Sequence, residues 1–320
     1  MARDRSGVRR ARRLLRYVRI MFPPPLALLG AAAFASIWLG LQALAGLAPL
    51  QIGARCALGA AGTALWMLLV RLMDDLQDAP HDLRLAAAGD ERYRSRPIAT
   101  GRITVPEIRR LAIGTAAALL ALSLLPRPGW MSLAAIGGLA LTWLGFRWFF
   151  IPGLVRRAGP LAYLLRKSLA ILIGAYALGA FHDQWPSAPL TWWAWPLVLA
   201  PALEVAAWET ARKIRLPEDE TAYGTYSKRF GWRAASLLPL LFAGGAAACL
   251  GLLSLPAGIT PAFPVYLAVA LLVLVVPVVR LRRRPSRAAA RLQPYAEAFG
   301  GLAHLGLIAA LGLRHGLALA

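Results

Sequence analysis

The chain has 320 residues, of which 58% are hydrophobic and 16% are charged, and its mean hydropathy is +0.56. A soluble domain of this length is less apolar, so the composition excludes an ordinary soluble enzyme. The formal net charge is +21. The basic residues lie between long apolar runs, which indicates topology signals and lipid-headgroup contacts rather than nucleic-acid binding.

Nine stretches are long and apolar enough to cross a membrane as helices. In chain order they cover about 25–47, 53–73, 107–125, 130–150, 160–181, 189–208, 233–254, 261–280 and 297–316. Residues 1–22 are rich in arginine and are predicted to form a basic cytosolic arm on anionic lipid. We predict that residues 23–320 form a single all-α transmembrane domain, with nine helices around a central cavity that opens to the cytosolic side.

The distribution of basic residues supports this division. With the N-terminus in the cytosol, 3 of the 36 Lys and Arg residues fall on the outer side, namely Arg55, Arg127 and Arg314. Cytosolic segments of membrane proteins carry an excess of Lys and Arg, and a miscounted helix would scramble the pattern. We therefore expect an integral protein of a bacterial inner membrane, with a cytosolic N-terminus, an external C-terminus and long cytosolic connections at about 74–106 and 209–232.

Four of the 15 acidic residues follow the second apolar stretch, at Asp74, Asp75, Asp78 and Asp82. Helical spacing puts Asp78 on one face with both Asp74 and Asp75. Pro80 is expected to end or kink the helix before Asp82. Carboxylates at the C-terminal end of a helix oppose its dipole and repel one another, so we expect a cation to hold them.

Mg²⁺ suits this cluster, because it typically binds one or two carboxylates together with substrate phosphates. The nearby Arg94 and Arg96 can bind the remaining phosphate oxygens as bidentate donors. The alternative is a solvated loop whose acids pair with its own arginines.

The segment resembles the first Asp-rich motif of the UbiA superfamily of intramembrane prenyltransferases, usually NDxxDxxxD. Asp75, Asp78 and Asp82 match its three aspartates, and Asp74 stands where that family has Asn. The family then has an Arg-Pro pair followed by glycine, which the segment from Arg96 to Gly101 matches, although the preceding stretch is several residues longer than usual. The nine spans and the catalytic loops after the second and sixth also match.

The second Asp-rich motif of this family matches a segment that departs from the pattern. Glu209 stands at the motif's first aspartate, and Lys213 stands where the second is expected. The residues that fall in register are Glu218, Asp219, Glu220, Gly224, Ser227 and Gly231. An ammonium group cannot ligate Mg²⁺ but can contact phosphate.

Three interpretations of this departure stay open. The protein uses one metal plus Lys213, or Glu218, Asp219 and Glu220 supply a second metal, or the donor is not an ordinary prenyl diphosphate. The structural alternative is a charged loop that makes its own salt bridges.

Three charged residues lie within predicted spans: Arg166 and Lys167 in the fifth and Glu204 in the sixth. Charges at such depth usually face a cavity or a partner. We expect Arg166 or Lys167 to contact the diphosphate or the acceptor, and Glu204 to contact the acceptor, with Tyr226 and Ser227 as further candidates. Snorkelling of the two basic side chains and an internal salt bridge of Glu204 are the alternatives.

The resemblance implies Mg²⁺-dependent transfer of a prenyl group from an isoprenyl diphosphate to a lipophilic, membrane-embedded acceptor, with Mn²⁺ as a possible substitute. The catalytic candidates are Asp75, Asp78, Glu209 and Lys213. The expected metal ligands are Asp74, Asp75, Asp78, Asp82 and Glu209. The expected diphosphate-binding residues are Arg94, Arg96, Arg166, Lys167 and Lys213.

Three alternative functions stay open. The first two are a UbiA-like phosphoribosyltransferase acting on polyprenyl phosphate and a UbiA-type terpene cyclase. The third, from another class, is a transporter with an acidic cytosolic gate. Transporters usually have essential charges near the midplane of the membrane, whereas most of these acids lie at its boundary, which favours an enzyme.

Overall fold

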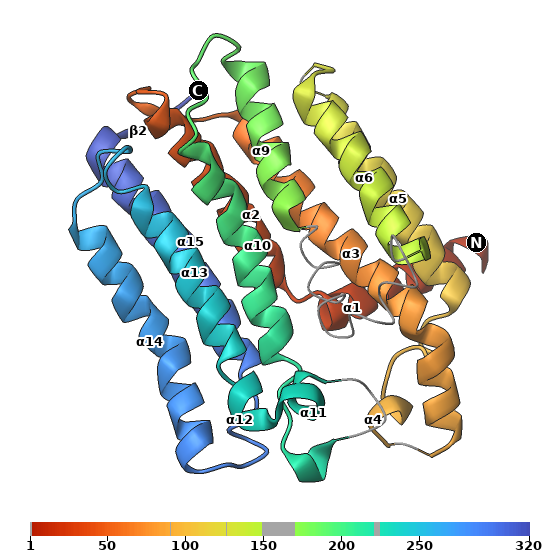
Figure 1. Ribbon diagram of the computed structural model, residues 1–320. Coiled ribbons are helices and arrows are strands. Elements are labelled where there is room, and N and C mark those ends of the chain that lie inside the picture. Colours follow the sequence, from red (N-terminus) through yellow and green to blue (C-terminus); the bar gives the residue numbers. More distant parts are fainter. Residues whose placement is uncertain (1, 90, 126, 149–169, 221–224) are drawn as a thin grey trace.

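The computed structural model describes residues 2–89, 91–125, 127–148, 170–220 and 225–320. The elements, in chain order, are α1 (Ala2–Met21), α2 (Pro24–Leu44), β1 (Leu50–Ile52), α3 (Ala54–Ala87), α4 (Glu91–Arg94), α5 (Val105–Leu124), α6 (Trp130–Trp148), α9 (Ile171–Gln184), α10 (Ala194–Ala211), the 3₁₀ helix η2 (Pro217–Asp219), α11 (Tyr226–Phe230), α12 (Trp232–Ala235), α13 (Leu238–Leu252), α14 (Ala262–Arg283), α15 (Gln293–His315) and β2 (Leu317–Leu319). The long helices stand side by side as a bundle, with α4, α11 and α12 at one end and β2 at the other (Figure 1).

Five stretches of the described helices are long and apolar enough to cross a membrane. They are α2, α3, the continuous stretch Trp232–Leu252, α14 and α15. Apolar helices of this length match the thickness of the hydrocarbon core of a bilayer. The chain is therefore an integral membrane protein. Every predicted span overlaps a described helix, but residues 160–169 of the fifth lie outside the described residues, so the count of nine stays a prediction.

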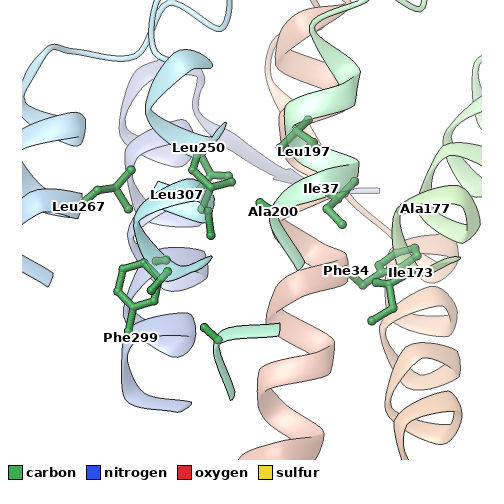
Figure 2. Packing of buried hydrophobic residues seen from close by; sticks show 14 of the residues in the cluster. Phe34, Ile37, Ile173, Ala177, Leu197, Ala200, Leu250, Leu267, Phe299 and Leu307 are labelled. Atoms are coloured by element: carbon green, nitrogen blue, oxygen red, sulfur yellow. The ribbon is translucent and has the colours of Figure 1, made fainter. Parts of the chain in front are cut away.

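The apolar core runs through the middle of the bundle (Figure 2). Its fully buried side chains include Phe34 and Ile37 of α2, Ala177 of α9, Leu197 of α10 and Leu307 of α15. Tight helix packing depends on small residues in a membrane protein, because lipid provides no hydrophobic driving force between helices. Gly59 lies against the ring of Phe34 and Gly138 against the indole of Trp66, with no room for a Cβ at either position.

A short parallel two-stranded sheet is the exception to the expected all-α fold. It pairs Leu50 with Leu317 and Ile52 with Leu319, joining the segment after α2 to the end of the chain. The buried Gln42 holds β1, because its Oε1 accepts the Gln51 N–H at 2.7 Å. Strands of three residues contain no usable periodicity, which is why the apolar pattern did not predict them.

The structure corrects the predicted end of the second span. Helix α3 continues through Pro80 to Ala87, so Asp82 lies on the same helix as the other aspartates. A proline removes one intrahelical hydrogen bond and strains the turn before it, and the bonds on either side keep α3 helical. Asp75 therefore lies twelve residues before the helix end, whereas the dipole acts within the last turn. The expectation that the helix dipole disfavours this carboxylate was wrong.

Candidate active site

Asp75 is held on both carboxylate oxygens. The hydroxyl of Tyr17 donates to Oδ2 at 2.6 Å, and Arg71 Nη2 lies 2.8 Å from Oδ1. Arg71 precedes Asp75 by one turn of α3, so the ion pair follows from helical spacing. Tyr17 lies on α1, so this hydrogen bond joins residues that are 58 positions apart in the chain. These two contacts hold Asp75 in one orientation, with its side chain 11% exposed.

Asp82 lies on α3 two turns after Asp75, and its side chain is 6% exposed. It pairs with Arg96, whose guanidinium also lies 4.8 Å from the centroid of the Tyr93 ring. The family pattern predicted both Asp82 and Arg96 as site residues, and the structure brings them into contact. Arg94 is exposed at the end of α4.

Asp75 and Asp82 line the same pocket. The lining residues are Tyr17, Met21, Asp75, Asp82, Arg96, Pro97, Ile98 and Ile108. Charged and apolar side chains therefore meet around one small concave site. Of the other two predicted ligands, Asp74 is half-buried and Asp78 is exposed on α3.

The donor set fits Mg²⁺ that arrives together with a phosphate ligand. Among the described residues, no group of three or more His, Cys, Asp or Glu side chains is arranged to hold a metal ion by itself. Two carboxylates that line one pocket nevertheless supply the protein's usual share of an Mg²⁺ site, because substrate phosphates complete the coordination.

Glu209 is fully buried in the last turn of α10, between two cations. Arg212 Nε lies 2.5 Å from its Oε2, and Lys213 Nζ lies 2.8 Å from its Oε1. Lys213 is itself 5% exposed, with its Nζ 5.9 Å from the centroid of the Tyr226 ring. The ion pair with Glu209 explains how the buried Lys213 is accommodated, whereas Arg212 is partly exposed. A metal-ligating role for Glu209 stays a prediction.

Tyr226 and Ser227 begin α11 and are buried. Ser227 Oγ accepts the N–H of Arg215 at 2.9 Å, which ties the segment after α10 to α11. Thr225 caps the helix, because its hydroxyl accepts the Lys228 N–H at 3.0 Å. These contacts shape the second loop, and acceptor contact by Tyr226 or Ser227 stays a prediction.

The second acidic cluster is dispersed over different partners. Glu218 is exposed, Asp219 lies 3.3 Å from Arg287, and Glu220 accepts a hydrogen bond from Thr225 at 2.6 Å. These pairs correspond to the charged-loop alternative. A second metal held by the three acids stays a prediction that these contacts do not favour.

Glu204 belongs to a buried polar contact between α10, α15 and α2. Its Oε2 lies 2.7 Å from His304 Nε2, and His304 Nδ1 lies 2.8 Å from Ser36 Oγ. The Glu204–His304 contact that the alternative interpretation needs is therefore present, and it is a salt bridge when His304 is protonated. The other oxygen, Oε1, is buried with no hydrogen-bond partner among the described residues. Arg166 and Lys167, the other predicted intramembrane charges, lie outside the described residues.

Replacement of His304 by Leu should destabilise the protein strongly. The change leaves the Glu204 carboxylate buried without its partner, which costs about 3–5 kcal/mol for a buried pair. The thermal unfolding midpoint in detergent should fall clearly below that of His182→Leu, because His182 is half-buried and contacts a ring, Trp130, rather than a carboxylate. Equal midpoints for the two variants would contradict this account.

Tyr17 and Arg71 contact Asp75, and the sequence interpretation included neither residue in the candidate site. The signal for Tyr17 is the amphipathic pattern of α1: Tyr17 is buried, and Arg12, Arg16 and Arg19 on the other face are exposed. Burial and the neighbouring Asp75 carboxylate raise the pKa of the Tyr17 phenol, so it stays a neutral hydrogen-bond donor.

The sequence matches no protein-family model and no curated protein. The fold, by contrast, is similar to solved structures. The apo structure of a UbiA homologue from Aeropyrum pernix K1 matches with a TM-score of 0.63 and 20% identity, over 87% of this chain and 97% of that one. The chain has a UbiA fold.

Two further solved structures have a similar fold. A digeranylgeranylglyceryl phosphate synthase matches with a TM-score of 0.57 and 14% identity, covering 94% of this chain and 99% of that one. A UbiA homologue from Archaeoglobus fulgidus, bound to DMAPP and Mg²⁺, matches with a TM-score of 0.55 and 16% identity, covering 93% and 99%. The predicted resemblance is thus confirmed for the fold, over nearly the whole chain.

Proposed function

We propose that this chain is a Mg²⁺-dependent UbiA-type prenyltransferase, which transfers a prenyl group from an isoprenyl diphosphate to a lipophilic acceptor in the membrane. The observation that carries the proposal is the pocket shared by Asp75, Asp82 and Arg96 at the edge of a UbiA fold. The UbiA homologue from Archaeoglobus fulgidus, which is bound to DMAPP and Mg²⁺, supports this reading.

Asp75, Asp78 and Asp82 are the residues proposed to hold Mg²⁺, with Asp74 beside them. The ion would neutralise charge on the diphosphate and orient it. Arg96 binds the diphosphate as a bidentate donor, and Arg94 adds positive charge at the rim. The apolar walls contributed by Met21, Ile98 and Ile108 keep water away from the reacting carbon.

Lys213 neutralises the leaving diphosphate as a point charge, in the position where UbiA sequences have an aspartate. Breaking of the bond between C1 and the diphosphate oxygen leaves negative charge on that oxygen, so fixed cations lower the barrier. Glu209 keeps Lys213 and Arg212 in place. This contact supports the one-metal interpretation of the second motif over one in which Glu209 is a ligand.

Glu204 contacts the acceptor in this proposal. Its buried Oε1 has no hydrogen-bond partner among the described residues and can therefore accept a hydrogen bond from an acceptor hydroxyl. We further propose that the protein lies in a bacterial inner membrane with its N-terminus in the cytosol, as the distribution of basic residues predicts.

The test is release of pyrophosphate by the purified full-length protein in lipid nanodiscs. The protein is incubated with Mg²⁺ and geranyl, farnesyl or longer diphosphates, with quinone, aromatic and phospholipid acceptors. We expect release that stops on addition of EDTA. An arm with phosphoribosyl diphosphate and polyprenyl phosphate tests the phosphoribosyltransferase, and product analysis without an acceptor tests the cyclase. No release from any prenyl donor, by protein shown to be folded, would overturn the proposal.

A further inference from the structure

Helix α1 packs one face against the bundle beside the pocket. Tyr17 is 4% exposed and shares a buried cluster with Leu72 of α3, Ile108 of α5 and Ile103. Its ring also lines the pocket that contains Asp75. A side chain with this much burial in an arginine-rich helix is placed by packing, rather than by contact with lipid alone.

We propose that Tyr17 is a positioning residue for donor binding, because its hydroxyl fixes the Asp75 carboxylate toward the pocket. The inference rests on the proposed function. It adds α1 to the site, although α1 precedes the segments that match the two Asp-rich motifs. The Tyr17 hydroxyl and Arg71 hold different oxygens of the same carboxylate, at 2.6 Å and 2.8 Å, so Asp75 is restrained from two sides.

The chemical nature of the hydrogen-bond donor to Asp75 matters, because Asp75 is proposed to bind Mg²⁺. A phenol is neutral, so it orients the carboxylate without cancelling its charge, whereas Arg71 competes with a bound cation. Removal of the Tyr17 hydroxyl leaves the ion pair between Asp75 and Arg71 in place and takes away the restraint on the other carboxylate oxygen. Partners that orient a metal ligand typically affect metal affinity by about 10- to 100-fold.

A second contact separates this role from simple docking of α1. Arg13 pairs with Glu107 at the start of α5, and Glu107 also accepts the Thr104 N–H at 3.0 Å. This pair and the apolar face of α1 remain when the Tyr17 hydroxyl is removed. Tyr17→Phe should therefore leave α1 in place and change only the hydrogen bond to Asp75.

Mg²⁺-dependent binding of a non-cleavable prenyl thiolodiphosphate to the full-length protein in nanodiscs tests the proposal. The matched control is Tyr266→Phe on α14. This change also removes a phenol hydrogen bond, which the Tyr266 hydroxyl donates to the backbone carbonyl of Leu302 at 2.9 Å. For Tyr17→Phe we expect the Mg²⁺ concentration for half-maximal binding to rise about ten-fold, with recovery at saturating Mg²⁺. For Tyr266→Phe it should stay at the wild-type value.

Unchanged Mg²⁺ dependence in Tyr17→Phe would overturn the positioning role while leaving the proposed function standing. A loss of binding that saturating Mg²⁺ does not restore, with a lowered unfolding midpoint, would also overturn it, because it would mean that the hydroxyl only docks α1. Absence of Mg²⁺-dependent binding in the wild type would instead reject the proposed function, and this inference with it.

Discussion

Asp75→Asn should reduce prenyl transfer roughly a hundred- to a thousand-fold, the loss typical for a group that stabilises developing charge. The amide keeps the shape of the carboxylate and can still pack beside Tyr17, but it removes the negative charge that the proposed Mg²⁺ needs. Asp78→Asn should have an effect of similar size. Steady-state pyrophosphate release at saturating donor and Mg²⁺ measures both.

The control for this result is Asp183→Asn. Asp183 is another ion-paired aspartate, which lies 3.2 Å from Arg55 and accepts the N–H groups of Trp130 and Met131 at the start of α6. It does not line the pocket. Its replacement should lower the unfolding midpoint and leave the turnover of folded protein near the wild-type rate. Full activity in Asp75→Asn, or an equal loss in Asp183→Asn, would contradict the metal assignment.

Glu209→Gln should have the largest effect on stability in the second loop. Glu209 is fully buried and contacts both Arg212 and Lys213, and neutralising it removes the negative charge from both ion pairs. Removing one partner from a buried ion pair costs about 3–5 kcal/mol. The unfolding midpoint in detergent, with and without a prenyl thiolodiphosphate, measures this cost, and the anionic ligand should restore part of the lost stability.

A double variant separates stability from chemistry. Lys213→Met in the Glu209→Gln background removes one of the two cations that contact Glu209 and should recover much of the midpoint, because residues 209 and 213 are coupled. Turnover should stay low, because Lys213 is proposed to neutralise the leaving group. Recovery of both stability and turnover would show that Lys213 has no catalytic role. Lys213→Asp is the complementary test: a gain of two-metal behaviour would mark position 213 as a former ligand position.

The sequence predicted the membrane class and the five spans that the described helices bear out, because apolar length depends on local composition alone. Two motif segments and the alternation of charged and neutral connections were enough to indicate a UbiA-type chain. The pairing of Asp82 with Arg96 was also within reach, since both residues belong to one recognisable pattern.

Tertiary contacts determined what the sequence did not predict. The hydrogen bond from Tyr17 to Asp75 joins residues 58 apart, and the approach of His304 to Ser36 joins residues 268 apart. Neither leaves a local pattern. Pro80 was expected to end or kink the helix before Asp82, and α3 instead continues through Pro80 to Ala87, so the expected end was wrong and a kink stays a prediction.

The amphipathic face of α1 was also overlooked, because its many arginines suggested lipid contact over the whole arm. Its exposed arginines remain consistent with anionic headgroups. The opposite face, with Tyr17 and Met21, lines the pocket. A helix of this kind can serve both roles, which composition alone does not separate.

The central claim is that the aspartates of α3 bind a prenyl diphosphate through Mg²⁺. The most direct measurement is equilibrium binding of a radiolabelled, non-cleavable prenyl thiolodiphosphate to the nanodisc-embedded protein, titrated with Mg²⁺ and then stripped with EDTA. We predict saturable binding that requires Mg²⁺, reverses on chelation and is lost in Asp75→Asn and Asp78→Asn. Binding that is insensitive to Mg²⁺, or that persists unchanged in both variants, would contradict the account.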